Sequence, residues 1–443
     1  MTRNRLPHDH AVTLSGDLTT SARIDWTPIP EPSALRKQRI ETAISTSLCL
    51  DDSRTDDQKR HNLEMQTGNP LSIVHITPAG GFGRVQHGGA ERAVLELAEQ
   101  TALAGHFVTI IAPGEFLSEV RAPIGVNLVS ADVTPRSLIS LVRIVRALAP
   151  DVVVGHLLRG VILAGLVRLL WRPKAVFVSN LHNSLNQAFE DVGTPPARRF
   201  VLRSALSSLH LGSRAATVAI SPSNVADLLE HDGFPVKKIE LINNWVAPNF
   251  APAEEAALSI RNELSIDRAS KIALFVGRLE HQKNPILAVR SVSRLSTPTT
   301  LLVAGAGSLK TELADAAVQL GVQIRFLGNV AHVERLMAAA DVVLVPSRYE
   351  GFGRVAVEAL ATGTPVVANS VAGLRDALAP FPSDWYSLIE TDDLDQWQES
   401  IERHFLRDAS PAVRASRHET VMHTYGLDAA VARYIRLYRS LLR

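Results

Sequence analysis

The chain has 443 residues, which is too many for one ordinary domain and predicts roughly two or three. Its formal net charge of +1 gives no overall field that would favour nucleic acid or an anionic membrane, so we expect no nucleic-acid partner. The single cysteine, Cys49, excludes an intramolecular disulfide and a cysteine-rich zinc site.

Residues 1–70 mix proline, serine, threonine and charged residues without sustained periodicity, and we expect a mostly disordered N-terminal extension. The start of the chain holds no apolar run like the core of a signal peptide. The apolar stretch 160–171 is interrupted by Arg168 and is too short to cross a bilayer as a helix. Together with the single cysteine, these features predict a cytoplasmic protein.

A regular alternation of strands and helices begins at Leu71. Residues 71–78 predict a buried strand, which a glycine-rich loop (79–89) connects to a helix over 90–105. Further predicted strands cover 106–113, 151–156, 174–182, 216–222 and 239–246, and further helices cover 135–150, 159–172, 196–213 and 223–232. This order is typical of a parallel sheet with helical crossovers.

The alternation stops at a polar segment, 247–269, and we place an interdomain linker at its start. It then begins again. Strands are predicted over 271–279, 299–307, 322–330, 341–347 and 364–370, helices are predicted from Pro285, Leu309, Val333 and Arg354, and an amphipathic helix is predicted over 427–443.

Two such series predict an α/β protein with two doubly wound, Rossmann-like domains that face each other across a cleft. We expect the first domain over 71–247, the second over 248–425, and a C-terminal helix, 426–443, that packs back toward the first. Ligands of such sheets bind at the carboxyl ends of the strands.

Five motifs in the right order resemble the large retaining glycosyltransferase family of the GT-B fold, called family 4 or group 1. The strongest is Ser347–Val367, which reads SRYEGFGRVAVEALATGTPVV and carries two glutamates separated by seven residues. The others are FVGRLEHQKN (275–284), LLVAGAGS (301–308), IRFLGNV (324–330) and HGGAER (87–92). The resemblance covers roughly residues 71–440.

The resemblance implies a transferase that moves a sugar from a nucleotide sugar, a UDP- or GDP-sugar, to a hydroxyl of an acceptor. The acceptor would be a sugar, a glycolipid or a polysaccharide, bound by the first domain, while the second domain binds the donor. No further cofactor is implied.

The residues around Glu350 predict a phosphate-binding turn independently of the resemblance. Gly351 and Gly353 permit a tight backbone path into a helix that starts near Arg354, where free N–H groups and the positive end of the helix dipole suit a diphosphate. The resemblance implies that Glu350 contacts the donor sugar and that Glu358 binds the ribose hydroxyls. As a catalytic residue, Glu350 could also be a nucleophile, and the sequence leaves the two mechanisms open. Phe352 belongs to the same donor-binding turn. The plain alternative is a loop-to-helix turn without a ligand.

Arg278 and Lys283 are placed to stabilise the charge that develops on the leaving diphosphate. In the similar family this pair grips the diphosphate. Solvated surface cations are the alternative. No Asp-x-Asp motif occurs in a suitable loop, so we expect no catalytic metal.

Several loop residues complete the predicted donor site. Gly305 closes the strand 299–307, and by resemblance the loop after the strand 322–330 meets the nucleobase through its backbone. The donor-binding residues predicted in these loops and in the first domain are Gly88, Gly89, Gly305, Gly328, Asn329 and Val330. Gly373 is predicted to frame the pocket, with a turn free of ligand as the equal alternative.

Two histidines end strands of the first domain. His182 resembles the histidine that approaches the donor sugar in the family, and His156 is a candidate for acceptor binding. A structural histidine is the alternative at each position. Asn244 matches an Asn of the family's Pro-Asn-Gly-Val turn, but Asn243 and Trp245 replace the flanking residues.

A basic helical region carries Arg198, Arg199, Arg203 and Arg214. In similar enzymes such a region can rest on the inner face of an anionic membrane that carries a lipid-linked acceptor. A solvated basic face is the favoured interpretation here.

Other functions remain open at this stage. A nicotinamide oxidoreductase also has glycine-rich turns, but GGFGRVQHGGAE lacks its glycine spacing and the glutamate pair would be unexplained. A sugar-nucleotide epimerase, a phosphorylase-like enzyme or a catalytically silent nucleotide-sugar-binding protein would share the fold.

Overall fold

The computed structural model describes residues 69–78, 88–171, 175–182, 189, 195–210, 214–230, 234–390, 392–407 and 410–443. Except for its last two residues, the extension predicted over 1–70 lies outside the described residues. The same holds for most of the glycine-rich loop, including His87.

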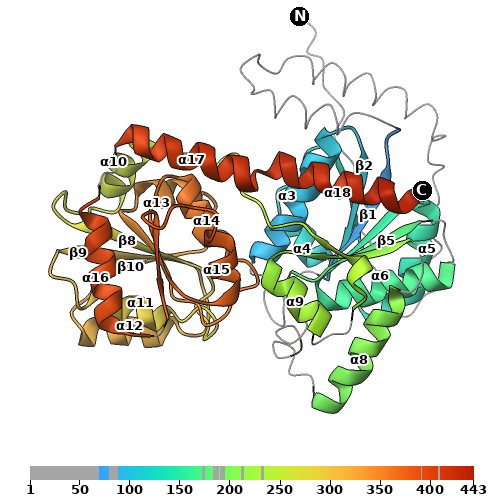
Figure 1. Cartoon of the computed structure of the whole chain (residues 1–443), viewed down its shortest axis with the longest axis horizontal. Helices are drawn as coiled ribbons and strands as arrows, with labels where there is room; N and C mark the ends of the chain where they lie inside the picture. Colours follow the sequence, from blue (N-terminus) through green and yellow to red (C-terminus); the bar gives the residue numbers. More distant parts are fainter. Residues whose placement is uncertain are drawn as a thin grey trace, which may run out of the picture. The chain divides into compact units, whose positions relative to one another are not determined.

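The first half of the described chain forms a parallel sheet of seven strands in the order β3-β2-β1-β4-β5-β6-β7. Figure 1 shows this sheet among its helices, with β1, β2 and β5 labelled. Its strands are β1 (Ser72–Ile76), β2 (Phe107–Ala112), β3 (Val126–Ser130), β4 (Val152–His156), β5 (Val176–Asn180), β6 (Ala215–Ala219) and β7 (Ile239–Leu241). The strands β4, β5 and β6 are buried along their whole length, which explains apolar runs such as Val152–Val154.

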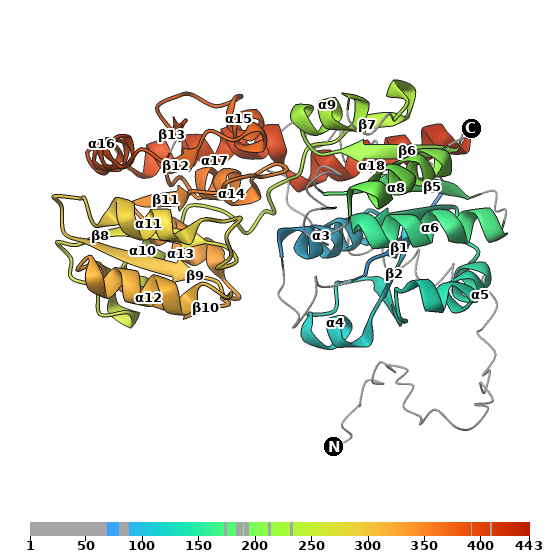
Figure 2. The same ribbon diagram turned by 90° about the horizontal axis from the view of Figure 1, so that it is seen from below.

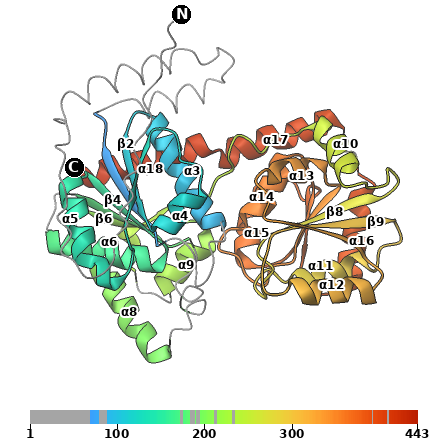
Figure 3. The ribbon, with the colours of Figure 1, turned by 180° about the vertical axis from the view of Figure 1, so that it is seen from behind.

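Helices cover both faces of this sheet. One face packs against α5 (Leu138–Leu148), α6 (Leu157–Trp171), α8 (Pro196–Leu209) and α9 (Pro222–Glu230). The other packs against α3 (Gly89–Leu103), α4 (Gly114–Glu119) and α18 (Leu427–Leu442). We call this sheet with its helices the first lobe. The last helix, α18, runs beside α3 and belongs to the core of this lobe (Figure 3).

A second parallel sheet has six strands in the order β10-β9-β8-β11-β12-β13. They are β8 (Lys271–Val276), β9 (Thr299–Ala304), β10 (Gln323–Gly328), β11 (Val342–Val345), β12 (Val366–Asn369) and β13 (Tyr386–Ile389). One face packs against α11 (Pro285–Val292), α12 (Lys310–Gln319) and α16 (Leu394–Phe405). The other packs against α10 (Glu254–Glu263), α13 (Val333–Ala339), α14 (Arg354–Ala361), α15 (Ala372–Leu378) and α17 (Pro411–Tyr425). We call this the second lobe (Figure 2).

The chain passes between the lobes twice, and the two passages are joined by backbone hydrogen bonds. Val246 N donates to Tyr425 O at 2.8 Å, and Leu427 N donates to Val246 O at 3.2 Å. Val246 follows β7, while Tyr425 and Leu427 are the last residue of α17 and the first of α18. The outgoing and returning segments therefore meet at one point.

The predicted α/β class and the two parallel sheets in series are confirmed. Several elements were not foreseen. The segment 247–269, predicted as polar linker, contains α10, whose Ile260 joins the core of the second lobe. The elements α4, β3, β13, α16 and α17 were also not predicted. The turn predicted at Gly373 is the first part of α15. The elements α4, β3 and β13 are short, and α17 has weak amphipathic periodicity. The helix α16 is clearly amphipathic, with Trp397 and Ile401 buried on one face, and could have been predicted.

Candidate active site

The turns after β8 and β9 lie in direct backbone contact. A Cβ atom at Gly305 would stand 1.9 Å from Gly277 O, and one at Gly307 would stand 2.4 Å from Leu279 O. Gly305 also has φ +145°, a backbone conformation that favours glycine. Gly305 N donates to Gly328 O at 2.7 Å, which joins the end of β10 to this group of turns. Three predicted donor loops thus form one packed unit at the carboxyl ends of the strands.

Lys283 and Glu350 form an ion pair beside these turns. Lys283 Nζ donates to Glu350 Oε1 at 2.5 Å, and Ser347 Oγ donates to the same oxygen at 2.8 Å. The two charged side chains keep 18% and 11% of their area exposed, so both are accessible to a ligand. Because both hydrogen bonds go to Oε1, Oε2 has no partner among the described residues and remains available as an acceptor.

Arg278 lies exposed at the end of β8 and is linked to the same group through Gln282. Arg278 Nη2 donates to Gln282 Oε1 at 2.6 Å, and Gln282 Nε2 donates to Tyr349 O at 3.3 Å. Arg278, Lys283 and Glu350, which the sequence predicts as site residues, are therefore brought together by the fold.

The turn that follows Glu350 leads into α14 as predicted. Gly353 is the N-cap of α14, with φ +89°. A Cβ atom at Gly373 would lie 2.2 Å from Glu350 O, so the start of α15 packs against the backbone of this turn. Phe352 is 2% exposed and meets the Tyr425 ring edge-on at 5.2 Å between centroids. A donor could therefore reach Phe352 only through its backbone.

Glu358 lies in an ion network with residues that the sequence analysis did not single out. Its side chain is 2% exposed. Its Oε1 accepts from Arg92 Nη2 and lies 3.2 Å from Arg354 Nη2. Arg354 Nη2 also donates to Glu96 Oε2 at 2.7 Å, and Trp245 Nε1 donates to the same oxygen at 2.8 Å. This network joins α3 of the first lobe to α14 of the second.

The predicted ribose contact of Glu358 stays a prediction, because both of its close partners are arginines of this network. A pattern in the sequence could have indicated the network. Arg92 and Glu96 are four residues apart, as are Arg354 and Glu358, a spacing that pairs side chains on one helix face.

Gly88 and Gly89 begin α3 as predicted, with Gly88 as its N-cap. Gly89 O accepts a hydrogen bond from Arg354 Nη1 at 2.9 Å, so the start of α3 contacts the start of α14. Contact of Gly88 or Gly89 with a donor stays a prediction.

Three histidines of the first lobe form a hydrogen-bonded chain. His75 Nδ1 lies 2.8 Å from His156 Nε2, and His156 Nδ1 lies 3.1 Å from His182 Nε2. The neighbouring rings are stacked, with centroids 5.1 and 5.4 Å apart. His75 and His156 lie on the face of β1 and β4 that packs against α3 and α18, because they continue the alternation of Ile73 and Val154.

Burial keeps these imidazoles neutral. It lowers the pKa of His75 to about 3. Burial, with the nearby charge of Arg354, lowers the pKa of His182 to about 3, and burial also holds the pKa of His156 well below its ordinary value. His156 has no exposed area, and both of its ring nitrogens face other histidines. Direct acceptor binding by His156 stays a prediction, and the geometry favours a role through His182.

The remaining predicted residues lie at the surface of the lobes or around the crossing. Gly328 ends β10 with φ +65°, Asn329 is exposed and Val330 is partly buried. Their contact with a nucleobase stays a prediction. Asn244 and Trp245 are buried at the crossing, where the indole of Trp245 reaches Glu96.

The basic region forms α8 as a helix, and Arg203 lies over the ring of Phe189 at 5.5 Å. In the part of the chain that the structure describes, no helix is long and apolar enough to span a membrane. Contact of α8 with a membrane surface stays a prediction. Across the same residues, no cluster of three or more histidine, cysteine, aspartate or glutamate side chains is arranged to hold a metal ion.

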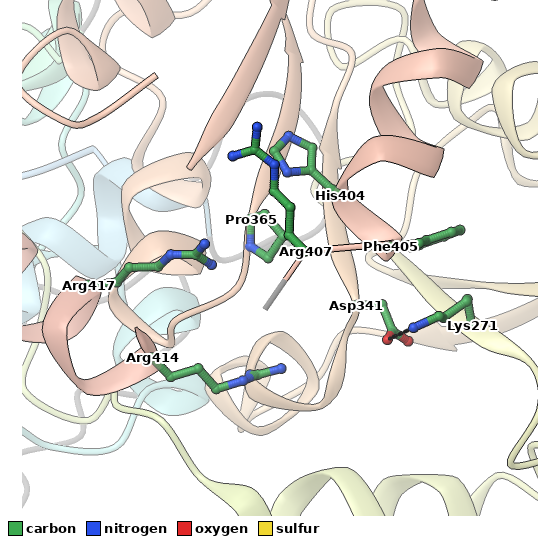
Figure 4. Close-up of a pocket in the computed structure, with 8 residues that line it drawn as sticks. All are labelled: Lys271, Asp341, Pro365, His404, Phe405, Arg407, Arg414 and Arg417. Atoms are coloured by element: carbon green, nitrogen blue, oxygen red, sulfur yellow. Dashed lines mark hydrogen bonds and ion pairs between the residues drawn. The ribbon is translucent and has the colours of Figure 1, made fainter. Parts of the chain in front are cut away.

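A small cavity of about 40 Å³ lies at the opposite end of the second sheet (Figure 4). Lys271, Asp341 and Pro365 line it at the amino ends of β8, β11 and β12, and Lys271 Nζ lies 3.1 Å from Asp341 Oδ1. Its other lining residues are His404, Phe405, Arg407, Arg414 and Arg417. This cavity is separate from the predicted donor site, which lies at the carboxyl ends.

Comparison with known proteins agrees with this geometry. Residues 258–416 match the family model of the glycosyl transferases group 1, and residues 87–250 match that of glycosyltransferase family 4. The chain belongs to the group 1, family 4 glycosyltransferases. The family predicted from the motifs is thereby confirmed.

Among its relatives, a D-inositol 3-phosphate glycosyltransferase of Mycolicibacterium smegmatis is 26% identical over 84% of this chain and 92% of the relative. An uncharacterized glycosyltransferase of Methanocaldococcus jannaschii is 33% identical over 39% of this chain. The chain spans about half the length of several curated relatives that it matches, 47% and 54% in two cases.

The fold is that of the GT-B glycosyltransferases. HepE of Anabaena, solved in complex with UDP-glucose, superimposes with a TM-score of 0.68 over 82% of this chain and 99% of HepE, at 16% identity. At that identity the likeness concerns the fold alone.

Proposed function

We propose that this protein is a retaining, metal-independent glycosyltransferase that moves a sugar from a nucleotide diphosphate sugar to an acceptor hydroxyl. The acceptor would be a sugar, a glycolipid or a growing polysaccharide. The observation that carries the proposal is the Lys283–Glu350 pair, held by Ser347 beside exposed Arg278 at the start of α14.

The charges of this group suit the departure of a diphosphate. Bond breaking at the anomeric carbon leaves negative charge on the diphosphate oxygens, and preorganised cations lower the free energy of that state. Lys283 and Arg278 supply the cations, and the free N–H groups at the start of α14 add hydrogen-bond donors. Because side chains supply this charge, the reaction does not require a metal ion.

Glu350 faces the sugar in this proposal. Its Oε1 is occupied by Lys283 and Ser347, and its Oε2 accepts a hydroxyl of the transferred sugar. The acceptor oxygen attacks the anomeric carbon on the face that the diphosphate leaves, which retains the configuration. The acceptor proton passes to the departing phosphate oxygen, so no further base is required.

Ribose binding by Glu358 requires that its contacts with Arg92 and Arg354 rearrange when the donor enters. The arginines then turn toward the phosphates or toward Glu96, which already contacts both. Donor binding and contact between α3 and α14 would in this way be coupled.

The first test is a thermal-shift screen of the whole protein with UDP-, GDP- and ADP-sugars, followed by transfer assays with the stabilising donor. UDP-glucose is the natural starting point, since HepE was solved with it. Stabilisation by one donor class and product with unchanged anomeric configuration would support the proposal. Activity that survives a metal chelator would support the metal-independent mechanism.

Three results would contradict the proposal. Binding without turnover across a panel of acceptors would favour a silent binding protein. Conversion of the donor sugar without an acceptor would favour an epimerase. Stabilisation by NAD(H) alone would favour an oxidoreductase.

A further inference from the structure

The histidine chain of the first lobe has two free ends. His75 Nε2 and His182 Nδ1 are buried ring nitrogens without a hydrogen-bond partner among the described residues. The four other ring nitrogens of the three residues lie in the two hydrogen bonds of the chain. Native proteins rarely leave a buried polar atom unpaired, so the two unpaired nitrogens indicate a missing partner or a functional role.

The protonation of one end determines that of the other. A neutral imidazole carries one N–H and one lone pair, so each histidine donates through one nitrogen and accepts through the other. If His182 Nε2–H donates to His156 Nδ1, then His156 Nε2–H must donate to His75 Nδ1, and His182 Nδ1 is a bare acceptor. If both hydrogen bonds donate in the opposite direction, from His75 toward His182, then His182 Nδ1 carries the proton. The three rings therefore change tautomer together.

The charge of Arg354 favours one of the two orders. Its charge adds to the effect of burial on the His182 imidazole. Because His182 Nε2 faces His156, Nδ1 is the ring nitrogen left to face other groups, and a nearby cation favours a lone pair over an N–H there. The favoured order thus leaves His182 Nδ1 bare and places the protons on the Nε2 atoms of all three rings.

The backbone of His182 also points to a functional position. His182 follows the end of β5 and has φ +61°, a left-handed conformation that costs free energy for a residue with a side chain. It lies at the carboxyl edge of the first sheet, near Arg354, whose Nη1 contacts Gly89 O.

We propose that His75 and His156 are positioning residues that fix the tautomer of His182, so that His182 Nδ1 accepts a hydrogen bond from a sugar hydroxyl of the substrate. This inference rests on the proposed transferase function. It assigns a role to His75, which contacts no part of the candidate donor site, through two intervening hydrogen bonds.

The direct test observes the tautomer and needs no activity. Long-range proton–nitrogen NMR of the full chain, labelled with ¹⁵N-histidine, distinguishes a bare ring nitrogen from a protonated one. The His182 signals are assigned by their loss in His182→Leu. We expect a bare Nδ1 and a protonated Nε2 in the wild type. In His75→Leu we expect a substantial fraction of protonated Nδ1, because the favoured order would leave the N–H of His156 Nε2 buried without its acceptor.

The second readout is kinetic. His75→Leu should lower kcat about tenfold, the factor that one lost hydrogen bond of about 1.4 kcal/mol produces. The KM for the donor should change much less. His75→Asn should recover most of the rate, because its amide oxygen can accept from His156 Nε2–H.

His106→Leu is the matched control. His106 is also a buried histidine of the first lobe, but its Nδ1 accepts from Leu71 N and it is not part of the chain. Loss of this ring should leave the His182 tautomer and kcat unchanged. An equal loss of kcat in His106→Leu would indicate a general effect of instability and would overturn the inference.

A protonated His182 Nδ1 in the wild type would also overturn the inference, as would an unchanged tautomer in His75→Leu. If no donor is turned over at all, the transferase proposal fails, while the NMR measurement still decides the protonation of the chain. An altered tautomer with unchanged kcat would overturn the positioning role and leave the transferase proposal intact.

Discussion

The two lobes share one architecture but place different chemistry at the carboxyl ends of their strands. In the first lobe, three buried neutral imidazoles form a chain across β1, β4 and the end of β5. In the second, glycines bring turns into contact and a partly exposed ion pair stands beside them. The first lobe presents buried neutral hydrogen-bonding groups, while the second presents partly exposed charges. This difference suits a sugar on one side and a diphosphate on the other.

The largest effect should come from removing the charge of the second lobe. Lys283→Ala should lower kcat by about two to three orders of magnitude, the usual loss for one group that stabilises developing negative charge. The melting temperature should change little, because the side chain is partly exposed and makes one ion pair. Lys310→Ala, at an exposed lysine at the start of α12, is the control. A wild-type rate in Lys283→Ala would contradict the proposed role of Lys283 in stabilising the leaving diphosphate.

Two Gly→Ala variants in the second lobe separate the cost of steric overlap between turns from the cost of an unfavourable backbone φ. Gly305→Ala should cost about 3 kcal/mol of unfolding free energy or more, because its Cβ would overlap Gly277 O. Gly321→Ala also has a positive φ, +67°, but in the left-handed region that a side chain can adopt, and it has open space around its Cβ, so it should cost only about 1–2 kcal/mol. Urea unfolding of both variants measures the difference. Equal costs would show that crowding between the turns is unimportant.

The first lobe should respond to acid through its histidines. His75 and His182 have pKa values of about 3 in the folded protein, below the ordinary 6.5 of the unfolded chain. Their contribution to stability is therefore complete above pH 6.5 and is lost as the pH falls toward 3. Near the middle of this range each should contribute a slope of about 1.4 kcal/mol per pH unit. Denaturant midpoints between pH 7.5 and 4.5 test this, and a flat profile would contradict it.

The smallest effect should come from the network that joins the lobes. Arg354→Met removes the contacts to Gly89 O, Glu96 and Glu358 but leaves Arg92 beside both glutamates. We expect a loss of about 2 kcal/mol, less than for a buried pair that loses its only partner. The matched change Arg335→Met removes an exposed pair with Glu263 and should cost less than about 1 kcal/mol. Equal losses of unfolding free energy in the two variants would indicate that the network between the lobes stabilises the protein no more than an exposed ion pair does.

The sequence predicted the sheets and part of the site for understandable reasons. Apolar runs and glycine turns are local signals, so β8, β9 and β11 and their loops could be read directly. The approach of Lys283 to Glu350 follows from the rule that strand ends converge at one edge of a parallel sheet.

The histidine chain and the ion network could not be read in this way. His75 stands in an apolar strand 81 residues before His156, and only the strand order places β1 beside β4. Arg92 and Glu358 are 266 residues apart and meet only where the lobes contact. The burial of Phe352 likewise depends on Tyr425 from a helix that was not predicted.

The position of α18 has a consequence for synthesis. Val431, Tyr434 and Tyr438 of this helix fill the core beneath β4, β5 and β6, which the ribosome makes about two hundred residues earlier. At a synthesis rate of about 5–20 residues per second that interval lasts roughly ten to forty seconds. During that time the part of this face that α18 later covers is exposed and prone to aggregate, which gives chaperones a target until α18 emerges.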